Sequence, residues 1–232
     1  MIRTATRLAA LMLVWGCFAP ALSLAQTQPF GQAAFPLKDD DGQPIANHAL
    51  SAEEMTSVAR LPGLVDIGSA DDDVTLYQFY DLNCPYCREA AADVDRLIQA
   101  DPALRLVLVP YPVLSIQSVE GARVELAVRE LTSPQKFLEF HRLIYAGRGI
   151  IDGDRALAVT QRMGLDRTKL IEVANAKRIT DIMSQHARAG TALRLNATPA
   201  YVIQGVAILG HPGFEPLQNV VAAVRRCKAV VC

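Results

Sequence analysis

The sequence predicts an α/β fold with an inserted helical subdomain, and three observations support this prediction. Strand-like runs flank one amphipathic helix before residue 110, only helical patterns occur over about 113–195, and a hairpin followed by a helix closes the chain. The 232 residues allow one domain with an insertion, or two small domains. The formal net charge of -1 offers no bulk field for nucleic acid or an anionic membrane, so we expect neither as a partner.

Residues 1–25 are typical of a cleavable secretory signal peptide. Two arginines precede an apolar run that begins at Leu8, and the segment ends on small residues up to Ala25. Pro20 interrupts the apolar run, which is also short for a bilayer span of roughly 20 residues, so a membrane anchor is disfavoured. Lipidation at Cys17 is the other alternative. We therefore expect an exported protein that works where disulfides persist.

Residues 26–62 are predicted to form an N-terminal arm with one short helix. Residues 26–43 are rich in proline, glycine and aspartate, which is typical of an extended linker without a core of its own. Ser51 and Glu54 have the spacing of a capping box, which predicts a helix over 52–59. The arm could serve as a flexible tether or as the contact of a homo-oligomer.

Residues 63–228 are predicted to form the main domain, followed by a C-terminal tail at 229–232. Its first part has strands at 64–67, 74–80 and 104–109, with a helix at 85–100 between the last two. The insertion, about 113–195, has helical patterns near 119–131, 134–146, 154–163, 168–174 and 178–193. The last part has strands at 200–204 and 206–209 and an amphipathic helix near 215–228.

The sequence Cys84-Pro85-Tyr86-Cys87 carries the most specific chemistry. It lies where a strand gives way to a helix, so Cys84 falls at the N-cap and Pro85 at the first helical position. The free amides and the dipole at a helix start stabilise a negative sulfur, so we expect Cys84 to be an exposed nucleophile of low pKa, aided by Arg88. Cys87, one turn further along, is the expected resolving cysteine.

The four cysteines after residue 25 form two close pairs. Cys84 and Cys87 are three apart on one helix, so they can form a labile disulfide that opens and closes. Cys227 and Cys232 are expected to form a structural disulfide that holds the C-terminal tail. The alternatives are a zinc site completed by all four thiols or by His211, and copper(I) binding by the first pair alone.

Two residues near the pair have alternative roles. Asp81 is expected to be a solvated turn carboxylate, with helix capping or proton transfer as alternatives. Tyr86 is expected either to contact substrate or to cover the start of the helix. The four histidines are scattered singly through the sequence, which is typical of surface or core positions.

The segment Phe79-Tyr80-Asp81-Leu82-Asn83 before the cysteine motif, the helical block and Thr198-Pro199 together resemble the DsbA-like branch of the thioredoxin superfamily, over about residues 64–228. The resemblance implies a thioredoxin-like fold in which Pro199 is cis and faces the sulfur of Cys84. It also implies that the backbone at Thr198 pairs with substrate, with Pro85 and Tyr86 supporting the active site. The Cys-Pro-Tyr-Cys motif and Thr198 are similar to those of the DsbG isomerase branch.

The resemblance implies a periplasmic thiol-disulfide oxidoreductase that needs no metal or other cofactor. Its expected partners are exported cysteine-containing proteins and a membrane redox partner that resets the pair of Cys84 and Cys87. The direction of exchange, oxidase or isomerase/reductase, stays open. The alternative is a copper-binding or client-holding periplasmic protein that uses the same thiols without turnover.

Overall fold

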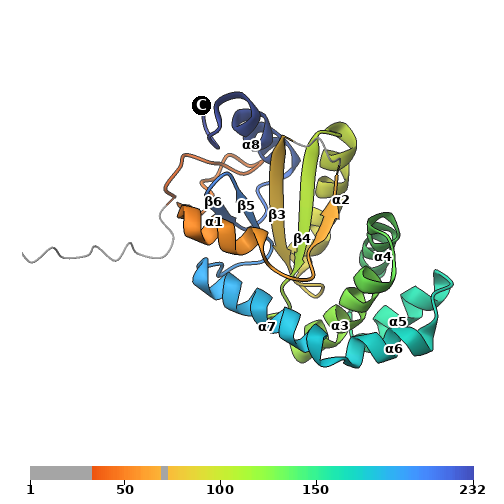
Figure 1. The fold of residues 1–232 in the computed structure, drawn as a ribbon. Coiled ribbons are helices and arrows are strands. Elements are labelled where there is room, and N and C mark those ends of the chain that lie inside the picture. The colour runs from red at the N-terminus through yellow and green to blue at the C-terminus, as the bar shows by residue number, and fades with distance from the viewer. Residues whose placement is uncertain (1–32, 69–72) are drawn as a thin grey trace, which may run out of the picture. The chain divides into compact units, whose positions relative to one another are not determined.

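A computed structural model describes residues 33–68 and 73–232, which form a central mixed sheet with helices on both faces (Figure 1). The predicted signal segment 1–25, with Cys17, and the first residues of the predicted arm lie outside the described residues. The strands are β1 (Asn47–Ala49), β2 (Val65–Ile67), β3 (Val74–Tyr80), β4 (Leu104–Pro110), β5 (Ala200–Ile203) and β6 (Val206–Leu209). Their order in the sheet is β1-β6-β5-β3-β4-β2.

The parallel pair of the sheet is β3 and β4, joined by helix α2 (Pro85–Ala100). Seven consecutive residues pair between these strands, from Val74 with Leu104 to Tyr80 with Pro110. All other neighbouring strands are antiparallel, including the hairpin of β5 and β6. The predicted strand-helix-strand unit and the predicted hairpin are therefore confirmed, and with them the α/β fold.

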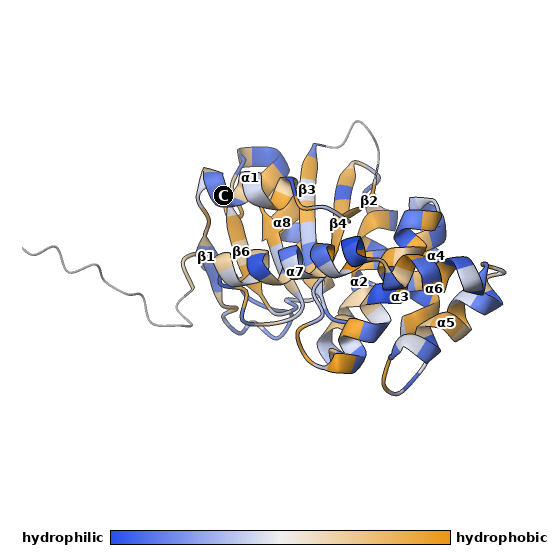
Figure 2. Cartoon of the chain, turned by 60° about the horizontal axis from the view of Figure 1, so that its bottom comes forward, coloured by the Kyte–Doolittle hydropathy of each residue, from blue (hydrophilic) through white to orange (hydrophobic). Residues whose placement is uncertain are grey.

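The two faces of the sheet bury separate apolar clusters. Alternate side chains of β3 point to opposite faces, so Leu76 and Tyr80 belong to one cluster while Tyr77 and Phe79 belong to the other. Helices α2 and α8 (Phe214–Cys227) contact each other on the first face, and α1 (Ala52–Ala59) and α7 (Lys177–Ala192) contact each other on the second. In Figure 2 the strands are largely hydrophobic in colour, whereas the surrounding helices carry both colours.

The insertion is wholly helical, as the sequence predicts. Its helices are α3 (Ile116–Leu131), α4 (Pro134–Ala146), α5 (Gly153–Arg162), α6 (Arg167–Asn175) and α7. Helices α3 to α6, green to teal in Figure 1, gather on one side of the sheet. Each of these four begins with a serine or aspartate whose side chain accepts a hydrogen bond from the third backbone N–H of the helix. Among the described residues, no helix is long and apolar enough to span a bilayer.

The described part of the predicted N-terminal arm has no core of its own but packs on the core of the main domain. Leu37 and Ile45 are buried in the main apolar cluster, and β1 pairs antiparallel with β6. The side chain of Asn47 fixes this segment, accepting from the N–H of Phe35 (2.8 Å) and donating to its carbonyl (2.9 Å). The capping box of Ser51 and Glu54 forms at the start of α1 as predicted.

Candidate active site

The local chain places Cys84 at the start of a helix. Strand β3 ends at Tyr80, a turn follows, and Cys84 is the N-cap of α2, with extended backbone and Pro85 at the first helical position. The N–H of Cys84 donates to the carbonyl of Asp81 at 3.1 Å, which closes the turn. The N–H of Arg88 donates to the carbonyl of Cys84 at 3.2 Å, which begins the helix. The strand-to-helix position that the sequence predicts for the cysteine motif is confirmed.

A segment more than one hundred residues away completes the surroundings of the sulfur. The Thr198–Pro199 peptide bond is cis, as the family resemblance implies. The thiol of Cys84 donates a hydrogen bond to the backbone carbonyl of Thr198 at 3.0 Å. Strand β5 begins directly after Pro199, and its pairing with β3 holds the two segments together, with Ala200 opposite Phe79.

The environment of Cys84 favours the thiolate. Its pKa falls from 9.0 to about 6, first because the thiol of Cys87 hydrogen-bonds to the sulfur, and then through the side chain of Thr198 and the amides of Cys87 and Tyr86. Partial burial opposes this fall. The helix amides that the sequence singles out therefore contribute, but the neighbouring thiol contributes more. The Cys84 thiol makes no capping hydrogen bond in this structure and instead donates to the carbonyl of Thr198.

Cys87 has the opposite character. It is 1% exposed, and burial raises its pKa above the ordinary value, as does the proximity of the Cys84 sulfur. Both cysteines are free thiols in this structure. The pair is therefore strongly asymmetric, with one sulfur ready to ionise near neutral pH and the other held protonated.

Cys84 is less accessible than the sequence predicts. Only 4% of its surface is exposed, whereas Tyr86, two residues further, is 63% exposed. The expectation of an open sulfur is wrong because the Thr198 segment packs against the start of α2. An attacking group therefore meets a sulfur with little exposed surface, whereas the side chain of Tyr86 is largely open to solvent.

Arg88 does not act on Cys84 as expected. Its guanidinium donates to the backbone carbonyls of Tyr145 (2.6 Å), Gly147 and Gly149 (3.4 Å). It also lies over the ring of Tyr145, 5.6 Å from the centroid. Arg88 is not among the leading causes of the lowered pKa of Cys84. Its observed role is to hold the segment after α4.

Asp81 is buried rather than solvated, so the expectation of a solvated turn carboxylate is wrong. Only 1% of its surface is exposed. One carboxylate oxygen accepts from the backbone N–H groups of Val113 (2.8 Å) and Leu114 (3.0 Å). The other accepts from the Ser118 hydroxyl (2.6 Å) and the N–H of Asn83 (2.8 Å). These four bonds satisfy the buried charge and tie the turn before Cys84 to the chain that leads into α3.

Asn83 makes a matching set of contacts that the sequence analysis did not anticipate. Its side-chain oxygen accepts from the N–H of Ile151 at 2.7 Å, and its side-chain nitrogen donates to the carbonyl of Ile151 at 2.8 Å. The same nitrogen donates to the hydroxyl of Ser118 at 3.2 Å. An amide can satisfy both backbone groups of one residue, and the partner is 68 residues away, so no local pattern reveals it.

A buried polar cluster lies near the pair on the same side of the sheet. Glu125 is fully buried, and one of its oxygens accepts from the hydroxyl of Tyr80 (2.9 Å) and contacts Nδ1 of His141 (3.2 Å). The other oxygen has no hydrogen-bond partner among the described residues. Burial, Glu125 and Cys87 all raise the pKa of Tyr80. No local sequence pattern points to this cluster, because its members are far apart along the chain.

The second cysteine pair stands apart from the first. Cys227 and Cys232 form a disulfide, with an S–S distance of 2.01 Å, at the end of α8. His211 hydrogen-bonds with Tyr201 (2.8 Å) and Asp93 (3.1 Å). In the part of the chain that the structure describes, no three His, Cys, Asp or Glu side chains gather closely enough to hold a metal. The four-ligand zinc site considered from the sequence is therefore not assembled there.

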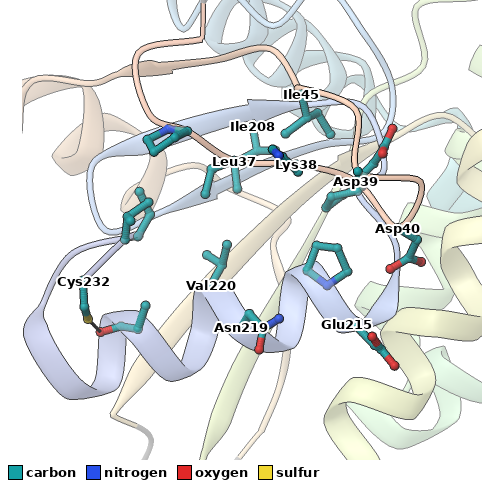
Figure 3. Close-up of a pocket in the computed structure, with 17 residues that line it drawn as sticks. Leu37, Lys38, Asp39, Asp40, Ile45, Ile208, Glu215, Asn219, Val220 and Cys232 are labelled. Carbon is teal, nitrogen blue, oxygen red and sulfur yellow. Dashed lines mark hydrogen bonds between the residues drawn. The ribbon is translucent and has the colours of Figure 1, made fainter.

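A cavity of about 500 Å³ lies beside this second pair and not beside Cys84 (Figure 3). Its walls are the N-terminal segment, including Leu37 and Ile45, the strand residue Ile208, and Val220 on α8. Cys232 lies at its edge, and none of the residues 81–88 or 198–199 lines it. The cavity is thus separate from the candidate active site.

The comparisons with known proteins agree with this geometry. The model of the DSBA-like thioredoxin domain matches residues 75–222. A thioredoxin-like oxidoreductase from Silicibacter pomeroyi DSS-3 is 32% identical, with a TM-score of 0.68, over 74% of this chain and 97% of that chain. No curated protein matches the sequence.

Two further solved structures are similar in fold. The catalytic domain of Proteus mirabilis ScsC is 19% identical, with a TM-score of 0.67, over 75% of this chain and 96% of that chain. The thiol-disulfide exchange protein α-DsbA2 from Wolbachia pipientis is 19% identical, with a TM-score of 0.65, over 75% and 98%. The fold, the cysteine pair at the start of α2 and the family match together lead to one assignment: the chain belongs to the DsbA-like thioredoxin family of thiol-disulfide oxidoreductases.

Proposed function

We propose that the protein is an exported, periplasmic thiol-disulfide oxidoreductase that exchanges disulfides with exported cysteine-containing proteins through Cys84 and Cys87. It acts as an oxidase or as an isomerase/reductase, and a membrane redox partner resets the pair. The observation that carries this proposal is the asymmetry of the two sulfurs, since the pKa of Cys84 is about 6 while that of Cys87 is raised by burial. An ionised, reactive sulfur beside a protonated one is what a nucleophile and its resolving thiol require.

In the oxidising direction, a substrate thiolate attacks Cys84 of the closed disulfide. The bond between Cys84 and Cys87 breaks, and Cys87 leaves as a thiolate that takes up a proton because its folded-state pKa is high. A second substrate thiolate then attacks the substrate sulfur of the mixed disulfide, and Cys84 leaves as the stabilised thiolate. The substrate gains a disulfide, and the protein keeps two electrons as the reduced pair.

In the reverse direction, the Cys84 thiolate attacks a substrate disulfide and one substrate thiol is released. Cys87 can resolve the mixed disulfide only after it loses its proton, which burial disfavours. This delay lengthens the life of the mixed disulfide and gives the substrate time to rearrange. The raised pKa of Cys87 therefore suits isomerisation as well as net transfer.

The size of the thiolate stabilisation argues that the pair of Cys84 and Cys87 has a moderate reduction potential. A pKa near 6 in place of 9.0 leaves Cys84 about nine-tenths ionised at pH 7 and stabilises the reduced pair by ~1.4 kcal/mol. That energy corresponds to a change of about 30 mV in the reduction potential of a two-electron couple. The reduction potentials of thioredoxin and DsbA differ by about 150 mV. This single effect is too small to make a strong oxidant, so we expect a pair that exchanges in both directions.

The experiment that tests the proposal is covalent trapping. In C87S the resolving thiol is missing, so a mixed disulfide between Cys84 and a client should accumulate and disappear on reduction. C84S is the matched control, because it keeps one thiol of the pair but loses the nucleophile. The absence of any client adduct in C87S, under conditions that trap a known exchange protein, would refute the proposal.

The direction of disulfide exchange follows from two further measurements. Alkylation of the cysteines in cells reports whether the pair is oxidised or reduced, and refolding assays compare a fully reduced client with a scrambled one. An oxidised pair active on the reduced client identifies an oxidase, and a reduced pair active on the scrambled client identifies an isomerase. Two blank assays with one copper ion retained per protein would replace the proposal with the copper-binding alternative.

A further inference from the structure

His211 joins the helix that begins at Cys84 to the strand that follows the cis segment, Thr198–Pro199. Its Nδ1 lies 2.8 Å from the hydroxyl of Tyr201 on β5, and its Nε2 lies 3.1 Å from the carboxylate of Asp93 on α2. A carboxylate can only accept, so Nε2 carries the hydrogen, and the Tyr201 hydroxyl then donates to Nδ1. A neutral imidazole therefore satisfies both partners, and the fully buried Tyr201 gains an acceptor for its hydroxyl.

The backbone of the same loop also holds the cis segment. The N–H of Gly210, the residue before His211, donates to the carbonyl of Pro199 at 2.9 Å. Strand β6 ends just before this loop and pairs with β5, which begins directly after the cis segment. The loop is thus bonded to this part of the chain through a backbone group and through a side chain. A displacement of the loop is therefore transmitted to the cis segment.

Asp93 extends this connection to α2. Its other carboxylate oxygen accepts from Arg96, one turn further along the same helix, at 3.1 Å, so the carboxylate is held in place. The side chains of Asp93 and His211 are only 26% and 12% exposed, so their contact is screened less than one on the open surface. The cis segment is therefore connected to α2 at a second point, besides the contact of Thr198 with Cys84.

The cis segment covers the nucleophile. The carbonyl of Thr198 lies 3.0 Å from the sulfur of Cys84, and only 4% of the surface of Cys84 is exposed. A reagent that approaches this sulfur closely meets the cis segment unless the segment moves. Parts of a folded protein open locally, at a free energy set by the contacts that hold them. The hydrogen bonds of His211 are contacts of this kind.

We propose that His211 and Asp93 are positioning residues that hold the cis segment against α2 and so keep Cys84 covered. The hydrogen-bonded chain Tyr201–His211–Asp93, which we call the histidine bridge, takes no part in making or breaking bonds at sulfur. It sets how often the cis segment opens, and hence how often the nucleophile can be reached. This inference rests on the proposed function and adds a control on its nucleophile, but alkylation of Cys84 tests it without any client.

The first test measures the alkylation of Cys84 by iodoacetamide, with only the pair of Cys84 and Cys87 reduced. Cys87 is buried with a raised pKa and the second pair is a disulfide, so Cys84 is the thiol that reacts. Rates measured against pH separate the pKa of Cys84 from the limiting rate constant of its thiolate. In D93A this constant should rise about fivefold, the change in an opening equilibrium expected for the loss of one hydrogen bond.

D95A is the matched control. Asp95 lies on the same helix, its side chain is 23% exposed, and it bonds Arg142 on α4 at 2.6 Å rather than the loop of His211. D95A therefore loses a comparable contact between α2 and another element, and it should leave the limiting rate constant unchanged. D93N keeps an oxygen that accepts from Nε2 of His211, so it should return the constant most of the way to that of the unaltered protein.

The second test breaks the histidine bridge at its other end. Y201F removes the hydroxyl but keeps the buried ring, and it should raise the limiting rate constant as D93A does. The double variant Y201F/D93A should show no further rise, because either change alone already breaks the chain. Effects that add in the double variant would show that the two residues act independently, and would overturn the proposal. Should D93A fail to fold, Y201F carries the same prediction.

Two other outcomes also overturn the proposal. An unchanged rate constant in both D93A and Y201F would show that the histidine bridge does not hold the cover of Cys84. An equal rise in D95A would show that the loss of any contact of α2 exposes the sulfur. The proposed function fails separately, through the absence of a client adduct in C87S, whatever the alkylation rates are. Unchanged alkylation with client adducts present leaves the proposed function intact and removes only this inference.

Discussion

The two cysteine pairs of this chain lie at opposite kinds of helix end and have opposite chemistry. Cys84 begins α2, where backbone N–H groups and the Cys87 thiol stabilise its negative form. Cys227 ends α8, where its sulfur faces carbonyl oxygens, at 3.2 Å from that of Ala223 and 3.7 Å from that of Ala229. A helix C-terminus disfavours an anion, so a thiolate leaving group is poor there. The surroundings of the first pair therefore favour an open, ionised form, whereas those of the second favour a closed disulfide.

The contrast between the two cysteine pairs predicts its largest effect on the rate of disulfide exchange. C84S should lose at least about a thousandfold in the rate of disulfide exchange with a reduced client, because no other sulfur in the site is activated. The C227S/C232S double variant should keep the rate within about twofold, since that pair is remote from Cys84. The rate of client oxidation at pH 7 measures both. Equal losses in the two variants would show that the pairs act as one relay.

The next effect is on stability. Replacing Cys227 and Cys232 by serine should lower the free energy of unfolding by about 2 kcal/mol, because the bond closes a loop with a sequence separation of 5 and restrains the unfolded chain. Urea titration of the protein with the first pair reduced throughout gives this value. An unchanged midpoint would show that this bond does not restrain the unfolded chain and would contradict the prediction.

A smaller effect is expected on the pH dependence of stability. Because the folded-state pKa of Cys84 lies below its unfolded value of about 9, ionisation adds stability that is complete above pH 9 and lost as pH falls through about 6. Cys87 is protonated in both states in this range, so it does not interfere. From pH 5 to pH 7, the free energy of unfolding of the protein reduced at Cys84 and Cys87 should therefore rise by ~1.4 kcal/mol relative to that of the oxidised protein.

Paired urea titrations at pH 5 and pH 7, with the Cys84 and Cys87 pair reduced or oxidised, measure that gain. The second disulfide is present in both samples, so its contribution cancels. A difference that does not change with pH would place the pKa of Cys84 at an ordinary value, and the contrast between the two helix ends would then fail.

The smallest effect concerns Arg88. R88Q should move the pKa of Cys84 by less than about half a unit, because the guanidinium is directed to the carbonyls of Tyr145, Gly147 and Gly149. Thiolate absorbance against pH measures the shift. A rise of a full unit would restore the direct electrostatic role that the sequence suggests.

Features with local signals could be predicted from the sequence. Strand β3 and helix α2 have the predicted bounds, Val74–Tyr80 and Pro85–Ala100, because the turn before Cys84 and the proline after it mark the boundary. The capping box placed α1 for the same reason. The lowered pKa of Cys84 is expected from its position at the start of α2, although the Cys87 thiol lowers that pKa more than the helix amides do.

Features that depend on distant contacts could not be predicted. Strand β1 has three residues, too few for a periodic pattern, and exists because β6 pairs with it. Asp81 has an ordinary turn composition around it, and its burial arises from chain more than thirty residues away. The partly unsatisfied carboxylate of Glu125 is likewise visible only once α3 and α4 pack together.

The short first strand also bears on how the protein avoids aggregation with the client chains proposed for it. Outermost strands offer unpaired backbone groups on which unfolded chains can aggregate. Here the described sheet ends in β1 on one edge and β2 on the other, and each has only three residues. The described sheet thus offers other chains little template for amyloid-like growth, and β1 shields the longer β6 from that role.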